Sequence, residues 1–265
     1  MGGIVNVNEL KIRIQMNKII RNKSFLSWSS GKDAAFTLHQ LIKQKKKPDL
    51  LLTTVNKDFQ RVSMHGLRIE LLEKQAEMLG IELYKIPLAK DVSMEDYNRI
   101  MEQAMLDLKT RGFNKAIFGD IFLEDLKDFR IKQMKKVGFE CEFPIWKRDT
   151  KKLALEIIDS GIKTLVVSIN SKKLDKSFVG REFNRDFLND LPENVDWCGE
   201  NGEFHTFVYN HPDFKRPIDF IIGEKIFKTY KPCSESDQNS YKKQAENTTD
   251  KWDTGFWYVE VALAK

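Results

Sequence analysis

The stretch over residues 25–38, Phe-Leu-Ser-Trp-Ser-Ser-Gly-Lys-Asp-Ala-Ala-Phe-Thr-Leu, constrains the fold more than any other part of this chain. A short apolar strand runs into small residues around Gly31, and a helix begins at Lys32 and Asp33. This order turns backbone N–H groups and the positive end of a helix toward one point, which is how proteins hold phosphate. The stretch therefore predicts a strand–loop–helix unit with an anion site at its loop, and it points to a nucleotide.

Strands and helices alternate from residue 24 to residue 169. The expected strands cover 24–27, 50–55, 83–88, 116–120, 142–146 and 164–169. The expected helices cover 33–44, 67–79, 93–111, 125–137 and 150–160, and most of them are followed by a glycine, which commonly ends a helix. This alternation predicts an α/β fold with a mostly parallel, doubly wound sheet and helices on both faces.

The pattern changes near residue 170. Residues 171–195 look helical and polar, whereas 204–209 and 217–222 are short β-like runs. Residues 231–251 are polar without apolar periodicity and are predicted to be mobile, and 252–263 is expected to form a late strand. We therefore expect an N-terminal extension (1–23), a nucleotide-binding domain (24–170) and a smaller C-terminal α+β domain (171–265) for the acceptor or substrate.

Composition restricts the classes of protein to consider. The chain has no window of about 18 uninterrupted apolar residues, so no membrane span is expected. Its cysteines, Cys141, Cys198 and Cys233, lie far apart without a Cys-x-x-Cys pair, which predicts a reducing, cytoplasmic setting with no disulfide framework and no structural zinc. The net charge of +5 suits a phosphate-bearing ligand but is too small and scattered to indicate nucleic acid.

Residues of the loop each have a role that phosphate binding would use. Gly31 lets the backbone approach an oxygen closely, Ser29 and Ser30 donate hydroxyl bonds, and Lys32 brings positive charge. Asp33 either caps the helix or helps to hold Mg²⁺ on the phosphates. The loop lacks the second glycine of a Walker A sequence, so on the residues alone an ordinary strand-to-helix turn explains it equally well.

The sequence Ser-Ser-Gly-Lys-Asp-Ala at 29–34 resembles the Ser-Gly-Gly-Lys-Asp-Ser loop of the PP-loop ATP pyrophosphatases, which have the adenine nucleotide alpha hydrolase-like (HUP-type) fold. Three further blocks, at 61–66, 118–121 and 198–207, look like those of the diphthine–ammonia ligase family and come in the family's order. The resemblance spans about residues 24–222, and its glutamate-containing last block is the most specific part.

This resemblance implies a reaction. ATP, with Mg²⁺, transfers AMP to a carboxylate with release of pyrophosphate, and ammonia then displaces AMP to give an amide. In the family the acceptor is diphthine on elongation factor 2, which occurs in archaea and eukaryotes. Two alternatives stay open: a PP-loop enzyme with another acceptor, such as a small molecule or a tRNA base, and a nucleotide-binding module without catalysis. A homodimer is also left open.

The resemblance also implies roles for individual residues. Catalytic roles are expected for Lys32, Asp33, Glu200, Glu203 and His205. Nucleotide contacts are expected from Ser27, Ser29, Ser30, Gly31, Lys32, Asp33, Ala34, Thr53, His65, Gly119 and Asp120, and a magnesium contact from Asp33.

Several of these residues have a structural alternative. The alternative for His65 is a local cap or packing contact, that for Asp120 is a simple turn, and that for Glu203 with His205 is a polar hairpin edge. The loop departs from the family at two positions. Ser30 stands for the second glycine, which costs little if its backbone angles are ordinary, and Ala34 lacks a hydroxyl that would touch phosphate.

Overall fold

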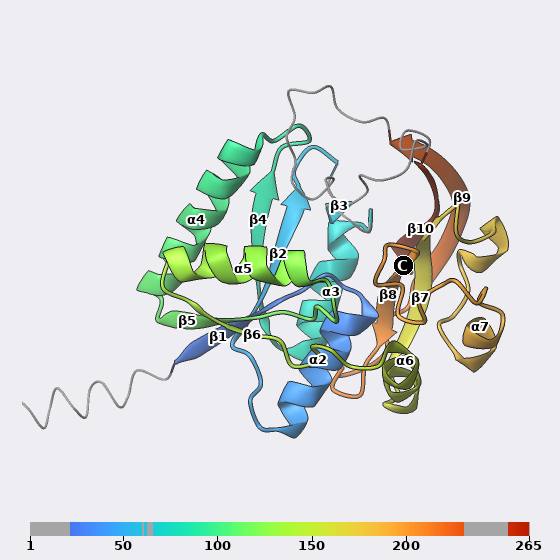
Figure 1. Ribbon diagram of the computed structural model, residues 1–265, viewed down its shortest axis with the longest axis horizontal. Coiled ribbons are helices and arrows are strands. Elements are labelled where there is room, and N and C mark those ends of the chain that lie inside the picture. Colours follow the sequence, from blue (N-terminus) through green and yellow to red (C-terminus); the bar gives the residue numbers. More distant parts are fainter. Residues whose placement is uncertain (1–21, 60, 63–65, 231–253, 265) are drawn as a thin grey trace, which may run out of the picture.

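The first half of the chain forms a six-stranded sheet, sheet A, whose strands are mostly parallel. The computed structural model describes residues 22–59, 61–62, 66–230 and 254–264 (Figure 1). The strands of sheet A are β1 (Lys23–Ser27), β2 (Leu50–Asn56), β3 (Arg61–Val62), β4 (Glu82–Leu88), β5 (Phe113–Ile117) and β6 (Glu140–Glu142). Five of them lie parallel in the order β4-β2-β1-β5-β6, and the short β3 runs antiparallel to the end of β2.

Helices cover both faces of sheet A. The helices that follow its strands are α2 (Lys32–Lys43), α3 (Ile69–Leu79), α4 (Met94–Thr110), α5 (Glu124–Lys136) and α6 (Thr150–Asp159). Phe25 and Leu26 are neighbours in β1 and point to opposite faces, as successive strand residues do. Leu26 belongs to the buried cluster that includes α2 and α3, and Phe25 belongs to the cluster that includes α4. The predicted doubly wound α/β sheet is confirmed.

The strand order places a topological switch point between β1 and β5. From β1 the chain moves outward to β2 and β4, then returns to the other side of β1 to form β5 and β6. Loops on the two sides of such a point diverge, so ligands of open α/β sheets bind there, beyond the carboxyl ends of the strands. The loop after β1 and the loop after β5 both lie at this edge.

The second half of the chain forms sheet B, which is antiparallel. Its strands are β7 (Lys163–Asn170), β8 (Phe204–Asn210), β9 (Phe220–Tyr230) and β10 (Thr254–Leu263), in the order β8-β7-β10-β9. The late strand expected over 252–263 is therefore present as β10. The expected strand over 164–169 is also present as β7, but it pairs with β8 and β10 and not with the parallel sheet.

Residues 171–195 differ most from the sequence interpretation. Only a 3-10 turn, η1 (Lys176–Phe178), and a short helix, α7 (Arg185–Asn189), form where a helical stretch was expected. Asp175 and Asn184 accept backbone N–H bonds that begin these two turns, and Gly180 adopts a left-handed φ of 86° between them. Local side-chain hydrogen bonds therefore replace a continuous helix here.

Smaller differences concern boundaries and coverage. Strand β6 ends at Glu142, so most of the strand expected over 142–146 is a turn, and β5 spans 113–117 where 116–120 was expected. Residues 1–21 and 231–253, which contain most of the expected extension and the expected mobile segment, lie outside the described residues. The division of the chain at residue 170 stays a prediction.

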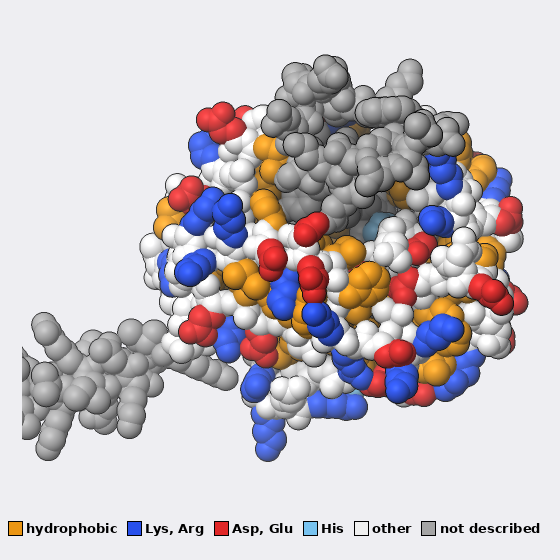
Figure 2. Space-filling view, in the orientation of Figure 1, with side chains coloured by type: hydrophobic (Ala, Val, Ile, Leu, Met, Phe, Trp, Pro, Cys, Tyr) orange, Lys and Arg blue, Asp and Glu red, His pale blue; other side chains and the backbone are white. Residues whose placement is uncertain are grey.

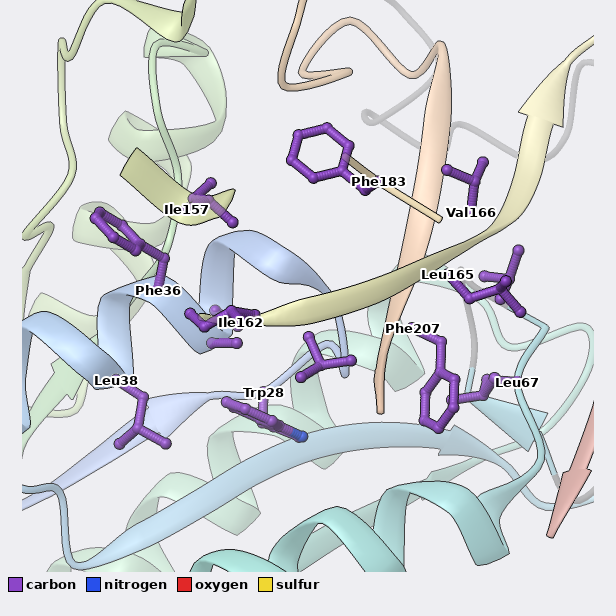
Figure 3. Packing of buried hydrophobic residues seen from close by; sticks show 14 of the residues in the cluster. Trp28, Phe36, Leu38, Leu67, Ile157, Ile162, Leu165, Val166, Phe183 and Phe207 are labelled. Atoms are coloured by element: carbon purple, nitrogen blue, oxygen red, sulfur yellow. The ribbon is translucent and has the colours of Figure 1, made fainter. Parts of the chain in front are cut away.

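The two sheets share one hydrophobic core. A single buried cluster contains Trp28 and Leu38 from the β1–α2 unit together with Leu165 and Phe207 from sheet B. Figure 3 shows these side chains spread along the layer from α2 to the strands of sheet B. All four are at most 4% exposed, so separating the sheets would expose a continuous apolar surface. The loop after β1 is consequently fixed against sheet B.

A buried glutamine joins three elements around that loop. Gln75 of α3 has no exposed surface, and its Oε1 accepts a hydrogen bond from Trp28 Nε1 at 2.8 Å. Its Nε2 donates to Ser30 O at 3.1 Å and to Val208 O at 2.7 Å. One amide thus ties the loop, helix α3 and strand β8 together.

Replacing Gln75 with leucine is expected to lower the free energy of unfolding by about 2–4 kcal/mol, because the Trp28 N–H and the Val208 carbonyl lose a buried partner. Chemical denaturation measures this change. The exposed Glu73→Leu on the same helix serves as the control and should cost less than about 1 kcal/mol. An equal loss in both variants would contradict the assignment.

Candidate functional site

The loop after β1 contains a strained serine. Ser30 has φ of 71°, in the left-handed region that favours glycine, and its side chain is fully buried. Its Oγ has no hydrogen-bond partner among the described residues. Serine was expected to cost little at this position only if its backbone angles were ordinary, and this condition is not met. The conformation itself is the one that the glycine of the family loop would adopt most readily.

Strand β8 runs along this loop and forms hydrogen bonds with part of its backbone. Val208 N donates to Ser30 O at 3.0 Å, and Lys32 N donates to Thr206 Oγ1 at 3.0 Å. Gly31 N donates to Ser29 Oγ at 3.3 Å, a longer and weaker contact. Two of the N–H groups expected to face phosphate thus have protein partners, and an anion that bound them would displace Thr206 and Ser29.

The side chain of Lys32 is buried and points toward the C-terminal block. Its ammonium is 2.9 Å from Asp33 Oδ2 and donates to Cys198 O. The rings of Phe204 and Phe183 lie 5.3 and 5.7 Å from it. Burial alone would lower the pKa of Lys32, but the carboxylate of Asp33 and other negative groups outweigh burial and raise it. Lys32 is therefore a fixed positive charge between the two sheets.

The loop after β5 packs directly against the start of α2. A side chain at Gly119 would meet Thr37 Oγ1 at 3.1 Å and Ala34 N at 3.2 Å, so only glycine fits without movement. The next residue, Asp120, pairs with Arg130 of α5 at 2.8 Å. Asp120 thus lies at the switch point, with its charge balanced by an arginine that sequence reasoning did not single out, and its nucleotide contact stays a prediction.

The acidic block at 196–203 reaches from sheet B to this same edge. Glu200 Oε1 accepts a hydrogen bond from Ile121 N at 2.9 Å, in the loop after β5. Burial, followed by the charge of Asp33, raises the pKa of Glu200 to about 7. A carboxyl group that titrates near neutral pH can accept or release a proton during a reaction.

Glu203 and Asp196 hold the block in shape. Glu203 is 1% exposed and accepts N–H bonds from Asp196 N, Asn201 N and Asn201 Nδ2 at 2.9 to 3.3 Å. Asp196 Oδ2 in turn accepts from Cys198 N and Glu200 N, both at 3.1 Å. Of the two glutamates expected to be catalytic, Glu200 is the one that contacts the switch-point loops.

The remaining expected residues have mixed surroundings. His205 lies half-buried in β8, and burial with the nearby Lys32 charge lowers its pKa to about 4, so it is neutral at pH 7. Ser27 ends β1, Ala34 is buried in the first turn of α2, and Thr53 is buried in β2. His65 lies outside the described residues.

Sequence reasoning missed Thr206, Gln75 and Arg130, which hold the site from three different elements. Thr206 lies inside the last family-like block, two residues before Val208, so its position on β8 was a usable signal. Gln75 and Arg130 occur in helices rich in charged residues and carry no comparable signal in the sequence.

An open groove lies at the end of β2, near the same edge of sheet A. Its volume is about 390 Å³. It is lined by Phe59, Arg61, Arg68, Ile69, Glu70, Glu73 and Lys85. Figure 2 shows basic and acidic side chains interspersed over much of one face of the molecule.

None of the helices in the described part of the chain combines the length and apolar character needed to cross a membrane.

The strand order and the loops at the switch point define a doubly wound α/β fold of the kind that binds ligands beyond the carboxyl ends of its strands. Comparison with known sequences gives the family. The sequence model described as "Diphthamide synthase N-terminal domain" matches residues 22–140, and "Diphthamide synthase C-terminal domain" matches residues 149–239. The chain therefore belongs to the diphthine–ammonia ligase family, and the resemblance seen in the sequence is confirmed.

Individual relatives are distant. The chain is 25% identical to "Diphthine--ammonia ligase" of Danio rerio over 169 residues, which cover 57% of this chain and 65% of that protein. The protein of the same name from Homo sapiens is 26% identical over 110 residues, covering 39% of this chain and 41% of that protein. The chain thus spans less than two thirds of these relatives.

A solved structure was also found, described as a predicted subunit of tRNA methyltransferase from Methanocaldococcus jannaschii. It is 16% identical, and the match covers 74% of this chain and all of that one. With a TM-score of 0.39 the likeness is too low to support the fold, which is assigned from the strand order.

Replacing Ser30 with glycine is expected to raise the free energy of unfolding by about 1 kcal/mol, because it removes the left-handed strain and an unpartnered buried hydroxyl. Denaturant titration measures the change. Ser29→Gly is the matched control and should lower stability, since it removes the contact with Gly31 N. Loss of stability in Ser30→Gly would contradict the account.

The raised pKa of Glu200 predicts a pH-dependent stability difference. The ordinary value is 4.5 and the value in the fold is about 7, so the folded state favours the protonated form and wild-type stability falls as pH rises from 4.5 to 7. Glu200→Gln removes this titration. The unfolding free energy of the variant minus that of wild type should therefore be larger at pH 8 than at pH 5, by ~1–2 kcal/mol.

The exposed Glu193→Gln, in the same segment, makes the same change of charge and serves as the control. Thermal and denaturant unfolding at pH 5 and pH 8 would measure both variants. A Glu200→Gln difference that does not change with pH would show that Glu200 has an ordinary pKa.

Proposed function

We propose that this protein is an ATP-dependent ligase that adenylates a carboxylate and then converts it into an amide with ammonia. The names of its relatives suggest diphthine as the carboxylate. Membership of the family supports ATP and ammonia as substrates. Elongation factor 2 is then the expected protein acceptor, and a cytoplasmic location follows from that acceptor.

One observation carries this proposal. The most specific family-like block contacts both switch-point loops: Lys32 Nζ, at the phosphate-type loop, donates to Cys198 O, and Ile121 N, in the loop after β5, donates to Glu200 Oε1. In this proposal a nucleotide site at the loop after β1 and an acid–base group from the segment before β8 would meet at one edge. A ligase needs this combination, because the activated phosphate and the group being joined must meet.

The residues at the loop fit a magnesium nucleotide. Asp33 Oδ1 and Ser30 Oγ are buried polar atoms without a hydrogen-bond partner among the described residues, and both lie at the N-terminal end of α2. A carboxylate oxygen suits Mg²⁺, and a hydroxyl with a helix N-terminus suits a phosphate oxygen. When bound, the metal would withdraw charge from the phosphates. Asp33 would hold it, and Ser30 would contact phosphate.

The proposed chemistry has two steps. A carboxylate oxygen of the acceptor attacks the α-phosphorus, and the bond from that phosphorus to the pyrophosphate oxygen breaks. Ammonia then attacks the acyl carbon, AMP leaves with the electron pair, and the nitrogen loses a proton. Glu200 is suited to take this proton because its pKa lies near 7. Lys32 contributes a fixed positive charge beside the developing negative charge.

The reaction can be tested with ATP, Mg²⁺, ammonium and elongation factor 2 that carries diphthine. Release of AMP and pyrophosphate should depend on the acceptor, and the acceptor should gain an amide. Glu200→Gln is expected to lower kcat by about a hundredfold or more, with ATP affinity nearly unchanged.

Glu193→Gln, exposed in the segment before the block, should retain wild-type kcat. If wild type binds ATP but no pyrophosphate appears with this acceptor, the assignment of diphthine is wrong. If Glu200→Gln retains full kcat, Glu200 is not the base.

A further inference from the structure

A second cluster of functional groups lies away from the loop, between the two sheets. It consists of His39 in α2 and of His211 and Asp213 in the turn after β8. Figure 1 shows α2 beside the end of β8. His39 Nδ1 is 3.8 Å from Asp213 Oδ2, and His211 Nδ1 is 3.4 Å from the same oxygen. One ligand atom from each residue falls within 4.8 Å of the others.

The ring of His39 packs near those of Phe36 and His211, but this packing does not satisfy its two nitrogens. It is only 7% exposed, and neither of its ring nitrogens has a hydrogen-bond partner among the described residues. Leaving a buried imidazole without partners costs about 1–3 kcal/mol. Its Nδ1 faces Asp213, so a ligand held between the two would satisfy it.

We propose that His39, His211 and Asp213 bind a divalent transition metal, with Zn²⁺ the best match. Two imidazole nitrogens and one carboxylate oxygen are a common zinc donor set, with water in the fourth position. Zinc bonds of 2.0–2.2 Å in a tetrahedron place ligand atoms about 3.4 Å apart. The observed 3.4 and 3.8 Å are close to this spacing. Asp213 is 34% exposed and gives water and the ion access.

The surroundings of His211 fit a metal-binding tautomer. Its Nε2 lies 3.1 Å from Ala35 O, so this nitrogen carries the proton and Nδ1 keeps its lone pair. A ligand histidine that donates its second nitrogen to a carbonyl is the usual outer-shell arrangement. His211 Nδ1 accepts a hydrogen bond from Asp213 N at 3.0 Å. A bound ion would replace this hydrogen bond, and Asp213 is exposed enough for water to take its place.

Both imidazoles are neutral at pH 7 and available to a metal. Burial lowers the pKa of His211 to about 4. Burial, followed by the charge of Lys43, also lowers the pKa of His39. Asp213 acts in the opposite direction on both rings, and a charge on His39 would further disfavour a charge on His211. An ion would therefore compete little with protons in neutral buffer.

The site uses no cysteine, so the absence of Cys-x-x-Cys pairs does not bear on it, and it departs from the prediction of no structural zinc. An ion bound by these three residues would join α2, which begins at the phosphate-type loop, to the turn that follows β8. Metal binding would then stabilise the fold, because only the folded chain brings these ligands together.

The test is a zinc titration of untagged protein stripped with EDTA, followed by calorimetry and by thermal unfolding. Wild type should bind one Zn²⁺ per chain, with a rise in Tm. Asp213→Asn should weaken binding at least tenfold, as should His39→Gln. Asp219→Asn, an exposed acid a few residues on that pairs with Arg216, should bind as wild type does.

Co²⁺ in place of zinc should give the visible absorption of a four-coordinate site in wild type and lose it in Asp213→Asn. If His39→Gln fails to fold, the surface variant Asp213→Asn decides the matter. The proposal is overturned if wild type takes up no zinc, or if Asp213→Asn binds it as tightly as wild type. Neither result would bear on ATP binding at the loop.

Discussion

The buried ammonium of Lys32 is the contact on which the arrangement of the site depends. It lies among the carboxylates of Asp33 and Glu200 and donates to a backbone carbonyl of the C-terminal block. A buried cation is tolerable only when paired and hydrogen-bonded, and its acidic neighbours are tolerable only because the cation is there. Removing it would leave these acids uncompensated at the point where the two sheets meet.

The shared core explains why a loop of sheet A and a block of sheet B can act as one site. Trp28 and Phe207 belong to the same apolar cluster, and Gln75 fixes the backbone between them. Preorganised donors and acceptors cost no rearrangement when charge develops, so a rigid junction suits phosphoryl and acyl transfer. The cost appears at Ser30, which is held in a conformation that glycine adopts more easily.

The sequence predicts what is local and misses what is long-range. The strand–loop–helix unit at Ser30 and the helix expected over 93–111 follow from neighbouring residues, and both form, the second with Ser93 as its N-cap. The strand at 164–169 was also predictable, but its pairing with β10 was not, because strand propensity does not determine which other strand it pairs with. The direction of the Lys32 side chain depends on Cys198, 166 residues away, and no local pattern encodes it.

The central claim is that the loop after β1 binds the phosphates of ATP while strand β8 holds it in place. The most direct test is calorimetric titration of the wild-type protein with ATP and Mg²⁺. The account predicts one ATP bound per chain. If the folded protein gives no heat with any adenine nucleotide, the claim is contradicted, and the contacts of Thr206 and Lys32 would serve only to join the two sheets.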